Sequence, residues 1–179
     1  ACSYCPREKV KGNMDFALFM KIVDEASQYG ARSFSLHLFG EPLLYRYWRE
    51  AVRYIKSCNR KHTVLLTTNG TALNAVVDDV CSSGIDLMLW TWRPEATFTP
   101  ETKEKLKRWG KFRVRFIQEI TPKEAYEEWA DWPNVEGRQM HNYGGNIDLS
   151  TFSNPTQPSA ITDGGNVPLK NFNGRWPCY

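Results

Sequence analysis

The sequence predicts an α/β fold built on a parallel β-sheet. β-rich segments and amphipathic helical segments alternate from the start of the chain to about residue 140. Strands that alternate with helices of this length join through right-handed crossovers and lie side by side in one sheet. From residue 142 onward the helical periodicity stops, and Asn, Gly, Pro and Ser become frequent. We therefore expect an α/β domain in residues 1–141 and an irregular extension in residues 142–179.

Five segments have the β-branched and aromatic composition of strands. They cover residues 33–39, 63–68, 86–92, 112–118 and 135–140. The helices are predicted from apolar residues that recur at spacings of three and four. These helices begin near residues 13, 46, 71, 99 and 121. Gly30 and Gly84 follow the first and third helices, which is typical of a helix C-terminus.

Three of the helix starts carry capping signals. Asn13 is the predicted N-cap of the first helix. Thr99 and Thr121 each precede a proline, a pair that places Thr at the N-cap and Pro at the first helical position. Glu124 would complete a capping box with Thr121.

Composition favours a globular protein of one domain. Of the 179 residues, 41% are hydrophobic and 24% are charged, which suffices for a core. The net charge is only +3, and the Lys and Arg residues are interspersed with Asp and Glu, so we expect no nucleic-acid partner. No apolar run approaches the roughly 18 residues of a membrane span, and no secretory leader is visible, so we expect a soluble, cytoplasmic protein with no membrane partner. An odd number of cysteines, five, argues against a disulfide framework.

Two motifs carry the chemistry. Cys2 and Cys5 are separated by two residues, so their thiolates can hold one metal ion or two corners of an iron–sulfur cluster. Gly40, Glu41 and Pro42 end an apolar strand, where Gly allows close approach of a ligand to the backbone and Pro stiffens the exit.

Together these motifs resemble those of the radical S-adenosylmethionine (radical SAM) enzymes, whose signature is Cys-x-x-x-Cys-x-x-Cys followed by a Gly-Glu-rich strand end. The resemblance covers most of residues 1–141. It implies a partial (β/α)6 barrel of which this sequence lacks the first strand. The first cysteine of the signature would lie upstream of Ala1, so we expect a fragment that is truncated at both ends and inactive by itself if that cysteine is absent.

The resemblance implies two cofactors and an electron donor. Cys2 and Cys5 would hold a [4Fe-4S] cluster together with the missing cysteine, and one iron would bind S-adenosylmethionine. Reductive cleavage by an electron from a donor such as flavodoxin or ferredoxin would give a 5′-deoxyadenosyl radical that abstracts hydrogen from the substrate. Tyr4 would lie near the adenine. The methionine ammonium would meet the strand end that is formed by Gly40, Glu41 and Pro42.

Further binding residues are expected at the carboxyl ends of other strands, where parallel barrels place their ligands. Asn69 stands in a run similar to the family's Thr-Asn-Gly. Thr91 takes the place of the Ser in the family's Ser-x-Asp, whereas Arg93 replaces its Asp and reverses the charge. Arg113 and Arg115 share one face of their strand, and Arg115 is the predicted ligand of the methionine carboxylate.

The end of the chain resembles the SPASM-containing type of radical SAM enzyme. Residues 141–145 are similar to a His-Asn-Trp-Gly-Gly segment of that type, and Cys178 would be the first ligand of an auxiliary [4Fe-4S] cluster in a missing extension. This implies a peptide or protein substrate. Arg93, Arg113 and Arg115 would suit a peptide with an acidic residue or a free C-terminus.

Other interpretations stay open. The chain could be an inactive binding or scaffold domain, or a zinc protein with a Cys-x-x-Cys motif. Glu41 could cap the following helix, Asn69 could form an ordinary turn, and the arginines could face solvent or pair with helix carboxylates. His141 could be a structural hydrogen-bonding residue. Cys58 and Cys81 stand alone in helices, which favours a packing role.

Overall fold

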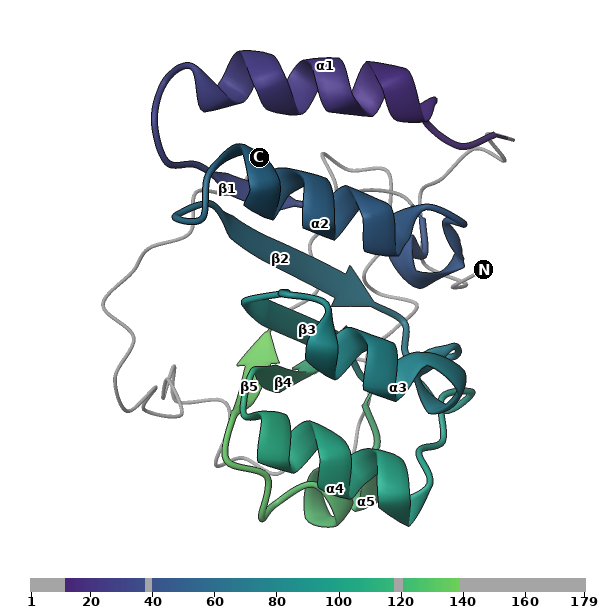
Figure 1. The fold of residues 1–179 in the computed structure, drawn as a ribbon. Coiled ribbons are helices and arrows are strands. Elements are labelled where there is room, and N and C mark those ends of the chain that lie inside the picture. Colours follow the sequence, from purple (N-terminus) through teal and green to yellow (C-terminus); the bar gives the residue numbers. More distant parts are fainter. Residues whose placement is uncertain (1–11, 38–39, 118–120, 139–179) are drawn as a thin grey trace, which may run out of the picture.

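The computed structural model describes residues 12–37, 40–117 and 121–138. Within them, parallel strands form one sheet in the chain order β1-β2-β3-β4-β5 (Figure 1). The strands are β1 (Ser33–Ser35), β2 (Thr63–Thr68), β3 (Leu87–Thr91), β4 (Phe112–Ile117) and β5 (Val135–Arg138). The helical elements are α1 (Phe16–Ser27), the 3-10 turn η1 (Pro42–Leu44), α2 (Trp48–Cys58), α3 (Leu73–Ser82), α4 (Pro100–Trp109) and α5 (Lys123–Glu128). The predicted α/β class with a parallel sheet is confirmed, whereas barrel closure is not seen in this part of the chain and the predicted extension lies outside it.

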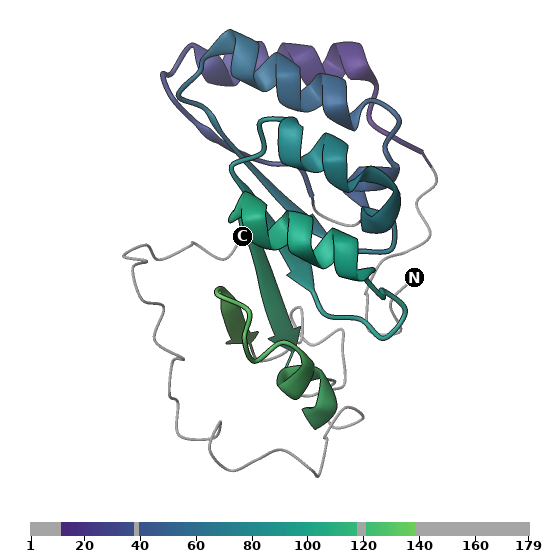
Figure 2. The same ribbon diagram turned by 60° about the horizontal axis from the view of Figure 1, so that its bottom comes forward.

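The core lies on one side of the sheet. Figures 1 and 2 show α2, α3 and α4 over the same face. Residues alternate along each strand, so that in β4 Phe112, Val114 and Phe116 are buried beneath the helices while Arg113 and Arg115 project from the opposite face. We call this opposite face the inner face. Its polar and charged positions include Thr67, Thr91, Arg113, Arg115 and Glu136 on the strands and His37 just after β1.

The predicted helix caps are partly confirmed. Thr99 caps α4, because its side chain accepts a hydrogen bond from the backbone N–H of Thr102. The prediction of Asn13 is wrong, since the carboxylate of Asp15 caps α1 through the N–H of Leu18, 3.0 Å away. The capping box of Thr121 and Glu124 is also wrong. Pro122 occupies the N-cap of α5, no side chain caps that helix, and Thr121 is buried.

β1 is shorter than its pattern predicts. It pairs with β2 only as far as Ser35, and the backbone N–H of Leu36 still donates to Leu65. At the next position of the ladder, the N–H of Thr67 donates to Nδ1 of the His37 imidazole, 3.2 Å away. The His37 side chain thus accepts the N–H that a backbone carbonyl would accept in a longer β1, and the regular pairing of β1 with β2 ends here.

A buried histidine joins the first helix to the sheet. His62 is fully buried, its Nδ1 accepts the backbone N–H of Arg32 at 2.9 Å, and its Nε2 lies 2.8 Å from the hydroxyl of Ser27. Because Nδ1 accepts, the neutral ring carries its proton on Nε2 and donates it to Ser27. The ring also meets Phe34 edge-on, with centroids 5.0 Å apart.

We expect His62→Leu to lower the free energy of unfolding by about 1–3 kcal/mol, because the part-buried Arg32 N–H would lose its acceptor and Ser27 its imidazole partner. Urea unfolding followed by circular dichroism measures the change. Lys61→Leu, at an exposed neighbouring position, is the control and should change stability by less than about 0.5 kcal/mol. Equal effects of the two substitutions would contradict the role of His62.

Candidate functional site

The Glu41 carboxylate connects two strand ends at the carboxyl edge of the sheet. Oε1 accepts the hydroxyl of Thr68 at 2.7 Å and the backbone N–H of Leu43 at 3.2 Å. Oε2 accepts the backbone N–H of Asn69 at 2.6 Å. Glu41 therefore caps η1, as the alternative interpretation has it, and it also ties the loop after β1 to the end of β2.

Burial makes it unfavourable for the Glu41 carboxyl group to carry its negative charge. Desolvation raises the pKa of Glu41 above its ordinary value, although the hydrogen bonds from Asn69, Thr68 and Leu43 act in the opposite direction. A negative charge in such a place is stabilised by a nearby cation. A Cβ atom added at Gly40 would meet no atom of the other described residues within 4 Å, so none of them crowds the backbone at this point. Both features fit the ammonium group of a ligand.

Asn69 forms an ordinary turn. Its side-chain oxygen accepts the backbone N–H and the hydroxyl of Thr71, at 2.9 and 2.8 Å. Its carbonyl accepts the indole N–H of Trp90 at 3.0 Å. Gly70 follows with a φ of +84°, and a Cβ there would come within 2.5 Å of Trp90 Nε1, so only glycine fits. The turn interpretation of Asn69 is confirmed, and its role as a ligand residue stays a prediction.

Strand register brings Thr91, Arg115 and Glu136 into one row on the inner face. Thr91 is opposite Arg115, and Arg115 is opposite Glu136 on the next strand. The guanidinium Nε of Arg115 donates to Oε1 of Glu136 in a half-buried ion pair. Sequence analysis missed Glu136, whose signal was its alternation with Val135 along the last strand. Arg115 thus pairs with a strand carboxylate, which neither sequence interpretation anticipated.

His37 is a second residue that sequence analysis missed. Its signal was the polar alternation of Ser33, Ser35 and His37 along one strand face. Nδ1 accepts the N–H of Thr67, so Nε2 carries the proton of the neutral ring and donates to the Thr67 hydroxyl at 3.2 Å. Desolvation lowers the pKa of His37 below 6.5, and the positive charge of Arg115 lowers it further.

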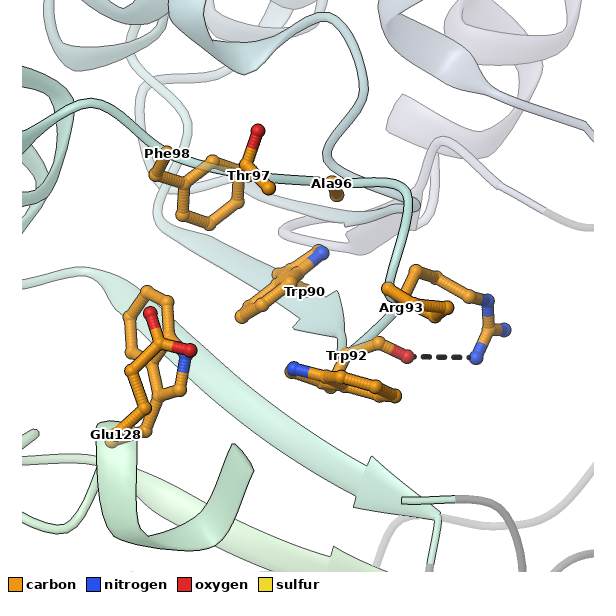
Figure 3. A pocket seen from close by; sticks show the side chains of 9 residues that line it. Trp90, Trp92, Arg93, Ala96, Thr97, Phe98 and Glu128 are labelled. Atoms are coloured by element: carbon orange, nitrogen blue, oxygen red, sulfur yellow. Dashed lines mark hydrogen bonds between the residues drawn. The ribbon is translucent and has the colours of Figure 1, made fainter. Parts of the chain in front are cut away.

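A small cavity lies beyond the carboxyl end of β3 (Figure 3). Its volume is about 130 Å³. Aromatic side chains form its walls and charged groups stand beside them; the residues are Trp90, Trp92, Phe98, Trp129, Arg93 and Glu128. Arg93 Nη1 donates to the carbonyl of Trp92 at 2.9 Å, so this cation lies beside the cavity.

Several predicted site residues lie outside the described part of the chain. They are Cys2, Tyr4, Cys5, the segment 141–145 and Cys178. Within the described part, no group of three or more His, Cys, Asp or Glu residues could hold a metal ion. Cys58 and Cys81 pack against the hydrophobic core, which confirms their predicted role. No helix in the described ranges has the length and apolar character to cross a membrane.

Comparison with known proteins gives a distant relative and a shared fold. No family model matches the sequence. The chain is 25% identical over 187 aligned residues to the tungsten-containing aldehyde ferredoxin oxidoreductase cofactor-modifying protein of Pyrococcus furiosus. That alignment covers 90% of this chain and 50% of the relative, so the chain spans about half the length of the curated relative it matches.

Solved structures of BtrN, a radical SAM enzyme, share the fold. The crystal structure of BtrN in complex with AdoMet and 2-DOIA superposes with a TM-score of 0.53 and 21% identity, over 76% of this chain and 63% of BtrN. An open conformation of BtrN gives a TM-score of 0.52 at 21% identity, over 77% of this chain and 58% of BtrN. The matched part of the chain shares the fold of BtrN. Nothing in these likenesses points to the SPASM type.

The pKa of His37 gives a direct test of the inner face. Because this pKa is lowered from 6.5, the unfolded chain binds more protons than the folded protein in the interval below 6.5. The stability that neutral His37 contributes is therefore complete above pH 6.5 and is lost as the pH falls through the lowered pKa. We expect the stability of the wild type relative to His37→Gln to decrease between about pH 7.5 and pH 5, as measured by urea unfolding.

The same arrangement predicts that Arg115→Met raises the pKa of His37, because it removes the neighbouring cation. An NMR titration of the imidazole measures this pKa in both proteins. A wild-type pKa at or above 6.5, or one that Arg115→Met leaves unchanged, would show that the two side chains do not interact.

Proposed function

We propose that the protein is a radical SAM enzyme that reductively cleaves S-adenosylmethionine and abstracts hydrogen from a peptide or protein substrate. The observation that carries the proposal is the Glu41 carboxylate, held at the carboxyl edge of a parallel sheet whose fold matches BtrN bound to AdoMet. Cys2 and Cys5 would hold the [4Fe-4S] cluster with a third cysteine of the complete protein, and Tyr4 would lie near the adenine. When bound, the cluster and S-adenosylmethionine would supply the radical chemistry.

The described residues offer one charge of each sign for the methionine group. Glu41 offers a fixed negative charge next to Gly40, where no other described residue crowds the backbone, and this suits the ammonium. Arg115 offers a positive charge on the inner face, which suits the carboxylate. Thr91 lies in the same row as Arg115 and supplies a hydroxyl. A zwitterionic ligand matches this set better than a simple anion or cation does, since each charge would meet its opposite.

The peptide substrate is supported by the resemblance of residues 141–145 and Cys178 to SPASM-containing enzymes. A second class of substrate is a small molecule. It is favoured by the names of the similar proteins, one a cofactor-modifying protein and one a complex with 2-DOIA, since neither name mentions a peptide.

Cluster binding and cleavage can be tested in the complete protein that contains this sequence, purified without oxygen. We expect Cys2→Ala and Cys5→Ala to lose iron and acid-labile sulfide, and to stop forming 5′-deoxyadenosine from S-adenosylmethionine and a strong reductant. Cys58→Ala and Cys81→Ala are matched controls, because these thiols pack against the core and should leave the cluster intact. A deuterated candidate peptide should pass its label to 5′-deoxyadenosine.

If the Cys2→Ala, Cys5→Ala double variant contains as much iron and acid-labile sulfide as the wild type, the cluster assignment is wrong. Zinc in place of iron would establish the zinc-protein alternative, and an intact cluster without cleavage would favour an inactive binding domain. Label transfer from a small molecule but from no peptide would assign the second substrate class.

Binding of the ammonium by Glu41 predicts that Glu41→Ala weakens the affinity for S-adenosylmethionine by about 1.5–3 kcal/mol, the range for a hydrogen bond to a charged group. Calorimetry on the cluster-loaded protein measures this. Glu50→Gln, at an exposed position in the first turn of α2, is the control for removal of a carboxylate. If Glu41→Ala and Glu50→Gln bind S-adenosylmethionine with the same affinity within error, Glu41 is not part of the site.

A further inference from the structure

The ion pair of Arg115 and Glu136 differs from the other ion pairs in the described ranges. Its side chains are 22% and 23% exposed, whereas every other pair except Lys56–Asp86 has a partner at least half exposed. Lys56 and Asp86 have a structural task, since Lys56 also bonds the carbonyl of His62 and Asp86 accepts the N–H of Val64. The pair of Arg115 and Glu136 instead lies on the inner face, opposite the helices that form the core.

The field of Arg115 reaches across the inner face. The sheet order places β2 and β3 between β4 and the end of β1, yet the Arg115 charge lowers the pKa of His37. Alternation with the buried Phe116 places the Arg115 side chain on the inner face, in one row with Thr91 and Glu136.

Glu136 restricts the motion of Arg115. An arginine side chain without a fixed contact has many rotamers, and holding it in one of them costs conformational entropy. Glu136 holds the Nε side of the planar guanidinium. A guanidinium carries five N–H donors in a fixed fork, so it can serve two carboxylates at once through different edges.

We propose that Glu136 is a positioning residue, which holds the Arg115 guanidinium in the orientation that receives the carboxylate of S-adenosylmethionine. This inference rests on the proposed function, because it takes S-adenosylmethionine as the ligand of the inner face. It concerns Glu136, a residue that does not itself touch the ligand.

A screening role for Glu136 predicts the opposite sign. If Glu136 only weakens the positive charge of Arg115, its removal makes the inner face more cationic and strengthens carboxylate binding. If Glu136 positions Arg115, Glu136→Ala weakens carboxylate binding. Glu136→Gln then rescues it, because the amide oxygen of Gln can still accept the N–H of Arg115.

The experiment compares S-adenosylmethionine with its decarboxylated analogue, which keeps the sulfonium and the amine. Calorimetry on the complete, cluster-loaded protein gives the ratio of the two affinities for the wild type, Arg115→Met, Glu136→Ala and Glu136→Gln. Each ratio is measured on one protein sample, so it does not depend on how much of that sample is folded. Asp79→Asn removes the carboxylate of an ion pair in the helix layer, that with Arg49, and is the matched control.

We expect the wild type and Asp79→Asn to prefer the carboxylated ligand by about tenfold or more, as a charged hydrogen bond allows. Arg115→Met and Glu136→Ala should lose most of this preference, and Glu136→Gln should keep most of it. A preference that rises in both Glu136 variants, or stays unchanged in Glu136→Ala, would overturn the positioning role. Equal wild-type affinity for both ligands would overturn this inference alone, whereas binding of neither would overturn the proposed function and this inference with it.

Discussion

In the described part of the chain, the packing of α2, α3 and α4 against one face of the parallel sheet determines which strand side chains face the site. Burial of Phe112, Val114 and Phe116 beneath the helices fixes the phase of β4, because a shift of one residue would turn all its side chains to the other face. Arg113 and Arg115 are thereby forced onto the inner face. Parallel sheets in proteins are usually covered on both faces. An inner face that carries arginines and a glutamate suits a polar ligand better than a second hydrophobic layer.

Glu41 and Arg115 place opposite charges at the same edge of the sheet by different means. Glu41 is held by backbone N–H groups and a hydroxyl, so its position depends on the geometry of η1 and of the turn after β2. Arg115 is a long side chain, and its position depends on a partner that the register of β4 and β5 supplies. The carboxylate is therefore held mainly by backbone N–H groups, whereas the described contact that orients the cation is a side-chain contact, the Glu136 pair.

Sequence periodicity was sufficient for the fold, and much less so for the site. Helices and strands followed from apolar spacing, and Thr99 was recognisable as a cap because it precedes a proline. The same signal failed at Thr121, where Pro122 itself became the N-cap and the Thr side chain turned into the buried interior. Local motifs identify hydrogen bonds within one turn of a helix, but they do not indicate when packing takes the side chain elsewhere.

The site residues that sequence missed share one property, which is that their partners lie on other strands. His37 bonds Thr67, and Glu136 bonds Arg115, so neither contact can be read from neighbouring residues. Only the register of the parallel strands brings them together.

The replacement of the family's Ser-x-Asp by Thr91 and Arg93 can be understood in the same way. Thr91 keeps its hydroxyl in the row of Arg115. Arg93 comes after β3 has ended, beside an aromatic cavity, with a guanidinium N–H bonded to the carbonyl of Trp92. The reversed charge thus borders the cavity past the strand end, and the negative charge of the inner face comes instead from Glu136 on β5.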